Sequence, residues 1–463
     1  MLATQLAALV DDVPAGVPQA LDLVTGFDAC LVTGFGRVGD DAAAALTALA
    51  AGVAVTPLGD RAAEAAAKLA AGSVSDEQLT VLAAARSALL GAVHDALLDH
   101  ADSALGRTRA PWPEEAPATP DAPRNLLEGC RSWLRELAIT GWRGVDHDLV
   151  SSSAQVLEAM WGDPRLRRLA VLIDGLAAEL RASAPIATMD DLPERRWADL
   201  WARAMLLCEA GGWGGGPVDT VSGRLLLLGV DVHEHATAVQ LQVHALLEVR
   251  GEAAPRLVRT GPAVAKVDTI VGPAIWPLFD AHPVLLAALT DNRTVEVTDV
   301  TLLGSGDLLW ADERAALGDP ADPFVTARLR LTDAVAPAVP PLDRHPVRLA
   351  EPVLVEGYTV DGDALVLDGH RLALDLDRLP ALGPLTPALV TGSTACLGLL
   401  RWDAGQWALQ PLAVHATVKR KPVPVHVGDW ASGPTDPRVA KAVKAAGDTV
   451  AVLRERAGRL LRR

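Results

Sequence analysis

The sequence predicts an α+β multidomain protein with a helical N-terminal half, a β-rich C-terminal half and a terminal helix. The chain has 463 residues, more than one ordinary core needs, because domains commonly hold about 100–200 residues. Apolar residues recur at helical spacing as far as residue 210, and beyond it they alternate with polar residues as in half-buried strands. The stretch GGWGGG at 211–216 separates the two patterns and predicts a linker between them.

Residues 1–104 predict a first, mostly helical unit. Ser75 and Gln78 form a capping box, in which both side chains satisfy free backbone N–H groups where a helix begins. The helical stripe that follows is apolar except for Arg86. Residues 105–124 are rich in proline and predict a linker. Residues 125–210 then predict a bundle or array of four helices, each with one apolar face.

Residues 217–336 predict a mixed β/α unit, in which a strand over 239–249 precedes a helix at about 272–291. Residues 337–434 predict a β-meander that forms a small barrel or sandwich. No sequence repeat with a fixed period is visible along the chain.

Turn and cap residues support the elements predicted near the C-terminus. The pairs Asp361-Gly362 and Asp368-Gly369 are typical of tight hairpin turns. Trp402 and Trp407 flank a third predicted hairpin, where they would face each other across two strands. Residues 435–463 predict an amphipathic helix, because Asp436 suits the N-cap and Pro437 the first turn.

The charge is distributed unevenly along the chain. The formal net charge is −16, yet residues 415–463 hold eleven Lys and Arg against four Asp and Glu, so that +7 lies there and −23 elsewhere. An acidic body repels phosphate, and we therefore do not expect general binding of nucleic acid. The basic patch Lys419, Arg420 and Lys421 indicates contact with a partner, or else a strand edge guarded by charge.

The cysteines and the N-terminus favour a cytoplasmic location. No two of Cys30, Cys130, Cys208 and Cys396 are close in sequence, which argues against zinc or redox CxxC motifs and favours a reducing compartment. The N-terminus lacks the basic region of a secretory signal. The longest apolar stretch, about Ala42–Val55, is shorter than the roughly 18–20 residues of a membrane helix, so we expect no membrane contact.

The stretch GFGRVG matches the GxGxxG pattern of dinucleotide-binding folds, with its glycines at Gly34, Gly36 and Gly39. It follows an apolar run at Ala29–Val32 that could be a strand, and a second short strand is predicted at Val53–Thr56. No alternating series of strands and helices continues from there. We therefore expect a glycine turn and no bound cofactor; a nucleotide-dependent enzyme built on these glycines is the alternative.

Two groups of residues resemble fragments of metal sites. Asp231, His233 and His235 would share one face of a strand and could start such a site. No further ligand is evident, since His244 is expected on the opposite face, so a polar strand face is the preferred interpretation. The pair His147-Asp148 with the upstream His100 is weaker still; Asp146 or Asp148 more simply caps a helix.

Four stretches of the chain resemble uncharacterised actinobacterial proteins: residues 192–207, 227–247, 341–359 and 399–421. Proteins of that group are encoded beside SWIM-type zinc-finger proteins, MoxR-type AAA ATPases and VWA-domain proteins. The resemblance implies protein partners, among them a MoxR-type AAA ATPase and a VWA protein, and it implies no catalytic mechanism. The sequence contains no Walker A, GxSxG or HExxH motif. We therefore expect a non-enzymatic scaffold or adaptor; the alternatives are the nucleotide-dependent enzyme and a nucleic-acid binder that uses 415–463.

Overall fold

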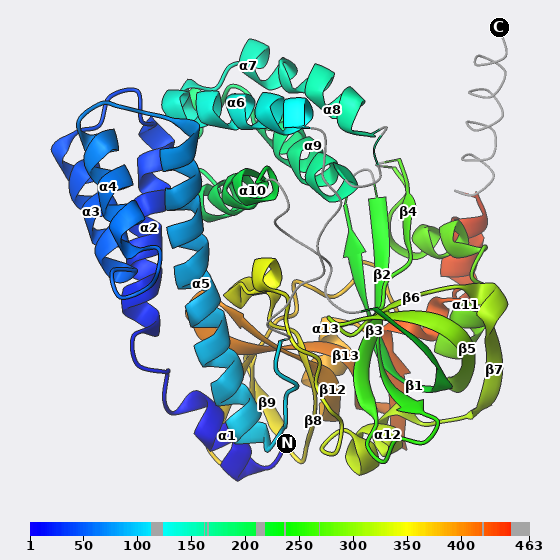
Figure 1. The fold of residues 1–463 in the computed structure, drawn as a ribbon. Helices are drawn as coiled ribbons and strands as arrows, with labels where there is room; N and C mark the ends of the chain where they lie inside the picture. The colour runs from blue at the N-terminus through cyan, green and yellow to red at the C-terminus, as the bar shows by residue number, and fades with distance from the viewer. Residues whose placement is uncertain are drawn as a thin grey trace, which may run out of the picture.

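The computed structural model describes residues 1–112, 124–161, 163, 166–209, 218–235, 238–267, 269–418 and 421–445. Helices fill the N-terminal half and two mixed β-sheets fill the C-terminal half, which confirms the predicted fold class (Figure 1). A helix over 437–445 ends the described chain. The boundary at 211–216, residues 113–123 of the proline-rich linker and the terminal helix beyond residue 445 lie outside the described residues.

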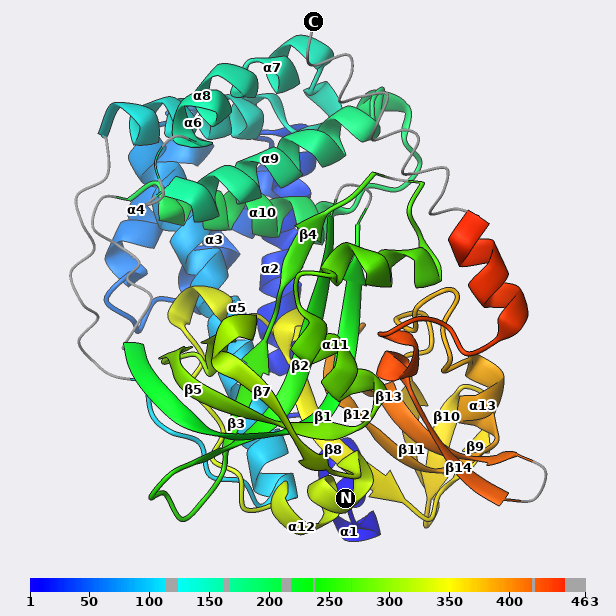
Figure 2. The same ribbon diagram turned by 90° about the vertical axis from the view of Figure 1, so that its right-hand side faces the viewer.

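The helical half is built on a core that is rich in tryptophan. Trp142, Trp197 and Trp201 are fully buried in it. Its elements are α1 (Ala3–Val10), α2 (Val17–Thr33), α3 (Asp40–Gly52), α4 (Gly59–Ala70), α5 (Asp76–Leu105), α6 (Arg124–Thr140), η1 (Trp142–Gly144), α7 (His147–Ser151), α8 (Ser153–Trp161), α9 (Arg167–Ala182), η3 (Ile186–Thr188) and α10 (Glu194–Leu207). In both ribbon views α6–α9 lie at the end of the molecule opposite α1 and α12 (Figures 1 and 2).

Helix α5 is the longest helix of this half. The predicted capping box at its start is confirmed: the Ser75 hydroxyl accepts from the Gln78 N–H, and the Gln78 side chain accepts from the Ser75 N–H. Arg86 interrupts the apolar stripe because it forms a buried ion pair, with its Nε 2.6 Å from Asp28 Oδ1. By length and composition alone α5 could cross a membrane, but 61% of that segment is buried within the protein, as in a core helix.

The first sheet closes into a barrel. The ring of hydrogen-bonded neighbours runs β1–β2–β3–β6–β5 and returns to β1, with β3 and β6 parallel and the other pairs antiparallel. Its elements are β1 (Val218–Glu234), β2 (Ala238–Val249), β3 (Arg256–Thr260), β4 (Ala263–Ala265), η4 (Gly272–Phe279), α11 (Pro283–Thr290), β5 (Arg293–Leu303), β6 (Asp307–Leu309), η5 (Asp312–Arg314) and β7 (Ala315–Pro320).

The second sheet repeats this topology. Strands β8 and β9 are halves of one bent strand, broken at Gly357 and Tyr358; β8 pairs with β12, β9 with β10, and β11 runs parallel to β13. Its elements are β8 (Glu351–Glu356), β9 (Thr359–Asp361), β10 (Ala364–Leu367), β11 (His370–Leu374), α13 (Pro387–Thr391), β12 (Ser393–Asp403), β13 (Gln406–Val418), β14 (Lys421–His426) and η8 (Val427–Trp430).

Both rings have the topology of the OB-fold, a five-stranded Greek-key barrel. In each, the first strand pairs with the second and the fourth, the third runs parallel to the fifth, and a helix lies between the third and fourth strands. We call residues 218–309 the first barrel and residues 351–418 the second barrel. Of the two forms predicted within 337–434, a barrel or a sandwich, the barrel forms, but the parallel pairing of β11 with β13 makes it a Greek key and not a meander.

The two barrels pack directly against each other. One hydrophobic core contains the interior residues of both, and α12 (Pro323–Arg330) covers their joint with Phe324. The predicted turns are confirmed, since Gly362 and Gly369 have the positive φ that tight turns favour. Trp402 and Trp407 face each other as expected, with ring centroids 5.1 Å apart and an interplanar angle of 76°.

Three local predictions were wrong. Ala29–Val32 belongs to α2 and Val53–Thr56 forms a turn. A run of four apolar residues fits either a strand or a buried helix, and here Phe27 and Leu31 bury at helical spacing. The helix expected at 272–291 is two elements, η4 and α11, because Pro277 falls inside the first and Pro283 begins the second.

Candidate functional site

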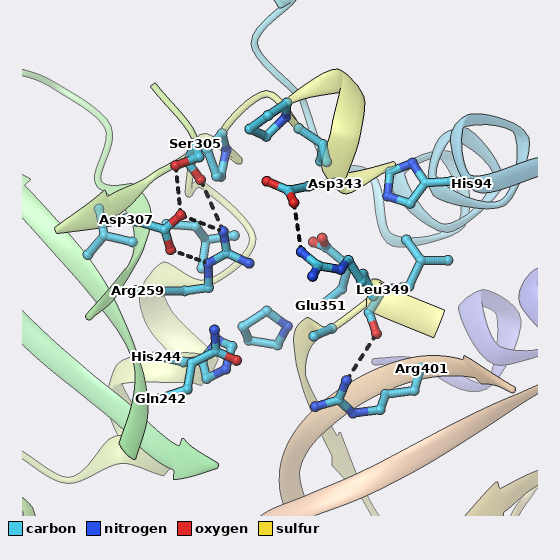
Figure 3. A pocket seen from close by; sticks show the side chains of 18 of the residues that line it. His94, Gln242, His244, Arg259, Ser305, Asp307, Asp343, Leu349, Glu351 and Arg401 are labelled. Carbon is cyan, nitrogen blue, oxygen red and sulfur yellow. Dashed lines mark hydrogen bonds and ion pairs between the residues drawn. The ribbon is translucent and has the colours of Figure 1, made fainter. Parts of the chain in front are cut away.

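A polar crevice of about 540 Å³ opens between both barrels, α5 and the segment 337–352, which we call the strap (Figure 3). The strap contains η6 (Pro341–Asp343) and η7 (Pro346–Arg348). The ionised side chains that line the crevice are Arg109, Arg259, Arg348, Arg378, Arg401, Asp307, Asp343 and Glu351. The crevice has the size of a small-molecule site, for which volumes of about 300–1,000 Å³ are common.

One wall of the crevice is the outer face of β2 and β3. Gln240, Gln242 and His244 point outward into the crevice, while the residues that alternate with them fill the barrel interior. His244 lies opposite Arg259 of β3 in the strand register. The loop between β5 and β6 adds Ser305 to the lining. The crevice thus occupies the second-strand and third-strand face and the loop between strands four and five, through which OB-folds bind ligands.

His244 is the most deeply buried of these polar groups. Only 1% of the residue is exposed, and its Nε2 has no hydrogen-bond partner among the described residues. Burial, assisted by the nearby Arg259, lowers the pKa of His244 to about 3. The imidazole is therefore neutral near pH 7. A buried polar atom without a partner costs about 1–3 kcal/mol, so a ligand that hydrogen-bonds to Nε2 would gain from it.

Arg259 is fixed at the mouth of the crevice but stays accessible. Its Nη2 lies 3.2 Å from Asp307 Oδ2 and 3.3 Å from the Ser305 carbonyl oxygen. The Ser305 hydroxyl donates to the same carboxylate at 2.7 Å. Since 33% of the Arg259 side chain is exposed, its guanidinium can bind a further acceptor.

The strap forms the facing wall and is tied to the helical half. Asp343 Oδ1 accepts from Arg348 Nη1 at 2.7 Å and from Arg168 Nη2 of α9 at 2.9 Å. His345 Nε2 lies 3.5 Å from Asp199 Oδ1 of α10. Figure 3 shows Asp343 across the crevice from the Arg259–Asp307 pair. Any movement of the strap would therefore involve both the crevice and the helices.

Glu351 anchors the end of the strap at the start of β8. Its Oε2 lies 3.0 Å from Arg107 Nη1 and 3.1 Å from Arg109 Nη2. Although burial opposes ionisation, these two guanidinium groups hold the pKa of Glu351 below its usual value. Arg109 also binds both oxygens of Asp102, at 2.8 and 3.1 Å. This cluster joins the end of α5 to the second barrel.

Asp231 is the polar link between the two barrels. It accepts from Arg401 Nη2 and Gln410 Nε2, each at 2.7 Å, and lies 2.9 Å from His233 Nε2. Burial alone would raise the pKa of Asp231, but His233, Arg401 and Gln410 lower it to about 2. The carboxylate is therefore ionised and fully engaged in structural contacts.

The structure brings together two of the three residues of the metal-site hypothesis. Asp231 and His233 are in contact, whereas His235 is exposed at the end of β1. His244 was expected on the opposite face; this was wrong, because it lines the same crevice as His233. Within the described ranges, no three His, Cys, Asp or Glu residues are placed to hold a metal ion together.

The weaker His-Asp group is dispersed. Asp146 caps α7 by accepting from the Leu149 N–H at 2.9 Å, as expected for one of the two aspartates. The side chains of His147 and Asp148 are 78% and 100% exposed. His100 Nε2 lies 3.1 Å from the Leu9 carbonyl oxygen and thus ties α5 to α1.

The glycine motif forms a tight contact between helices. Gly34 ends α2 with a φ of 78°, and a Cβ atom there would lie 2.4 Å from the Gly141 nitrogen. The N–H of Gly36 donates to the Ile139 carbonyl oxygen at 2.9 Å, and Gly39 caps α3. The turn is thus occupied by the chain itself, and the preceding strand that dinucleotide binding requires is a helix.

The basic patch can be described only in part. Lys419 and Arg420 lie outside the described residues, and Lys421 begins β14, where its backbone pairs with Val418. The crevice, by contrast, was not predicted at all. The sequence indicates it only through Gln240 and Gln242, polar residues at alternate positions of β2. That pattern is equally typical of a solvated strand face.

Comparisons with protein-family models, with curated proteins and with solved structures found no match to this chain. The partners implied by the resemblance to actinobacterial proteins therefore stay predictions.

Proposed function

We propose that this protein is a non-enzymatic, cytoplasmic adaptor whose conformation responds to a small ligand in the crevice. The observation that carries this proposal is the origin of the lining: α5, the strap and both barrels all contribute to it. A ligand that contacts all of them would stabilise their relative arrangement, because binding to the folded state alone adds RT ln(1 + [L]/Kd) to its stability.

The electrostatics of the crevice favour binding over catalysis. Strongly perturbed acids can mark catalytic sites, but structural ion pairs perturb pKa values in the same way. Asp231 and Glu351 are of the second kind, since each is ionised and held by arginines of its own cluster. Such fixed charges set the shape and the potential of a binding site.

The test is a thermal-shift screen of small polar compounds against the full-length protein. We expect at least one compound to raise the melting temperature of the native protein and of the exposed-site control His235→Gln. The same compound should fail to stabilise His244→Gln, whose altered group faces the crevice. If no compound class gives a shift that depends on His244, the proposal is wrong.

We further propose that the adaptor works in one assembly with a MoxR-type AAA ATPase and a VWA protein. Only the resemblance of residues 192–207, 227–247, 341–359 and 399–421 supports this choice of partners. Affinity purification of the tagged full chain from its native cells should recover both proteins. Recovery of nucleic acid without them would favour the alternative, a nucleic-acid binder that uses 415–463.

A further inference from the structure

We propose that the crevice binds a small phosphorylated compound, with the phosphate between Arg259 and Arg348 and a hydroxyl-bearing body along Gln240 and Gln242. The inference rests on the proposed function and specifies the ligand class of the same site. It follows from the arginines of the crevice, from the polar row on β2, from the strap and α5 that cover this face, and from the buried imidazole of His244.

The exposed guanidinium groups of the crevice suit an anion. Five arginines and three carboxylates line it, and Arg109 and Arg401 also pair with Asp102 and Asp231 outside the lining. Arg259 and Arg348 keep exposed guanidinium groups, and such cations in a concave site attract anions. Arginine is also the side chain whose planar fork matches the oxygens of a phosphate, with two parallel N–H···O bonds.

The arginines at the mouth are already oriented for such a ligand. Arg259 is held by Asp307, and Arg348 is held by Asp343, which lies across the crevice from Arg259 (Figure 3). Both side chains remain partly exposed, at 33% and 46%. Each keeps N–H donors beyond those in its ion pair, because a guanidinium has five. A phosphate could therefore bind without breaking either pair.

The side chains of the polar row suit the body of a sugar phosphate. Gln240, Gln242 and His244 occupy alternate positions of β2, so the row spans about 13–14 Å at roughly 3.4 Å per residue. A glutamine amide both donates and accepts, as vicinal hydroxyl groups do. His233 lies opposite Gln240 in the strand register and adds an imidazole to the same row.

Two features disfavour a nucleic-acid strand on this face. Single strands are held on OB barrels largely by stacking of bases on aromatic side chains. Among the described residues that line the crevice there is no Phe, Tyr or Trp. The strap and α5 also lie over the β2–β3 face, so the site is a crevice and not an open groove along which a chain could run.

The buried Nε2 of His244 is the second, independent sign of a ligand. It lies at the end of the row that is opposite Arg259, and it has no partner among the described residues. A neutral imidazole can accept from a hydroxyl group or donate to a phosphate oxygen. A ligand whose phosphate binds Arg259 and whose body lies along β2 would therefore lie beside it.

The experiment is isothermal titration of the full-length protein with ribose 5-phosphate, ribose, citrate and a ten-nucleotide oligo-dT. We expect ribose 5-phosphate to bind and ribose to bind at least tenfold more weakly. Arg259→Gln and Arg348→Gln should each weaken ribose 5-phosphate at least tenfold. The matched control Arg224→Gln, which removes an exposed arginine paired with Glu248 outside the crevice, should leave binding unchanged. Circular dichroism and unliganded melting temperatures check that each variant folds.

The other outcomes separate the two proposals. If ribose binds as tightly as its phosphate and His244→Gln weakens both, the phosphate inference is wrong and the ligand-binding adaptor stands. Preferential binding of citrate would assign the site to carboxylates and overturn the phosphate inference alone. Binding of oligo-dT alone would assign the face to nucleic acid. If none of the four binds and the compound screen is negative, both proposals fail.

Discussion

The two barrels have the same topology but differ in what lies on the outer face of their second and third strands. In the first barrel the outer face of β2 and β3 carries glutamine, histidine and arginine and lines the crevice. In the second barrel the equivalent strands, β10 and β11, are short, and α1 packs against β11. His370 of β11 lies 3.2 Å from Asp11, just after that helix.

The loops between the fourth and fifth strands differ in the same sense. In the first barrel the loop between β5 and β6 presents Ser305 to the crevice, and the Ser305 carbonyl oxygen accepts from Arg259. In the second barrel β12 and β13 meet in a tight hairpin that the Trp402–Trp407 pair closes. The comparison shows that topology sets where a ligand face can lie, while side chains and covering helices decide whether it is used.

The largest effect is expected where the second barrel holds the first. Arg401→Ala would remove a cation from beside the Asp231 carboxylate, and Asp231 is only 4% exposed. Breaking a buried ion pair costs about 3–5 kcal/mol, so the free energy of unfolding in urea should fall by that amount. Arg224→Ala, which breaks an exposed pair, should cost less than about 1 kcal/mol. Equal costs would mean that the barrels do not depend on this link.

A smaller effect is expected where the backbone of the first barrel packs against Leu412 of the second. A Cβ atom at Gly229 would lie 2.9 Å from the Leu412 Cβ of the second barrel, so Gly229→Ala should destabilise by about 1–3 kcal/mol through overpacking. The control is Gly175→Ala on α9, where a Cβ atom meets nothing within 4 Å and helix propensity favours alanine. Adding Leu412→Ala to Gly229→Ala should recover part of the loss in chemical denaturation; no recovery would argue against the contact.

The pH dependence of stability should reveal the buried imidazole of the first barrel. The pKa of His244 is about 3 in the folded protein, below the roughly 6.5 of an unfolded chain. The unfolded state therefore binds more protons below pH 6.5, and the free energy of unfolding falls as the pH falls. Between pH 7 and pH 5 this group should contribute a loss of about 1–2 kcal/mol. The loss should be absent in His244→Gln and unchanged in His235→Gln; an unaltered slope in both variants would contradict the burial of His244.

The smallest effect is expected at the hairpin that distinguishes the second barrel. Trp402 and Trp407 meet edge to face, a geometry worth about 0.5–1.5 kcal/mol beyond the buried area. A double-mutant cycle with Trp402→Leu and Trp407→Leu should return a coupling energy of that size. Neither substitution should change ligand affinity in the crevice of the first barrel. A change in affinity would show that the two loops are not independent.

The sequence by itself determined those features that neighbouring residues control. Ser75 and Gln78 predicted the start of α5, and the Asp-Gly pairs predicted two of the hairpin turns. The change of hydrophobic period predicted the helical and β-rich halves. In each case the cause is local, since a cap, a turn or an amphipathic face depends on residues a few positions apart.

Only the tertiary structure decided the barrels and the crevice. The ring closes through β1 with β5 and β3 with β6, and those strand pairs depend on contacts between distant residues that no local period encodes. In the sequence Arg86 is only a polar break in an apolar stripe, and the fold explains it by bringing Asp28 beside it. The sequence placed His244 on the wrong face of its strand and gave no sign of its burial, because the strap, which is distant in sequence, and Arg259 of the neighbouring strand surround it and lower its pKa.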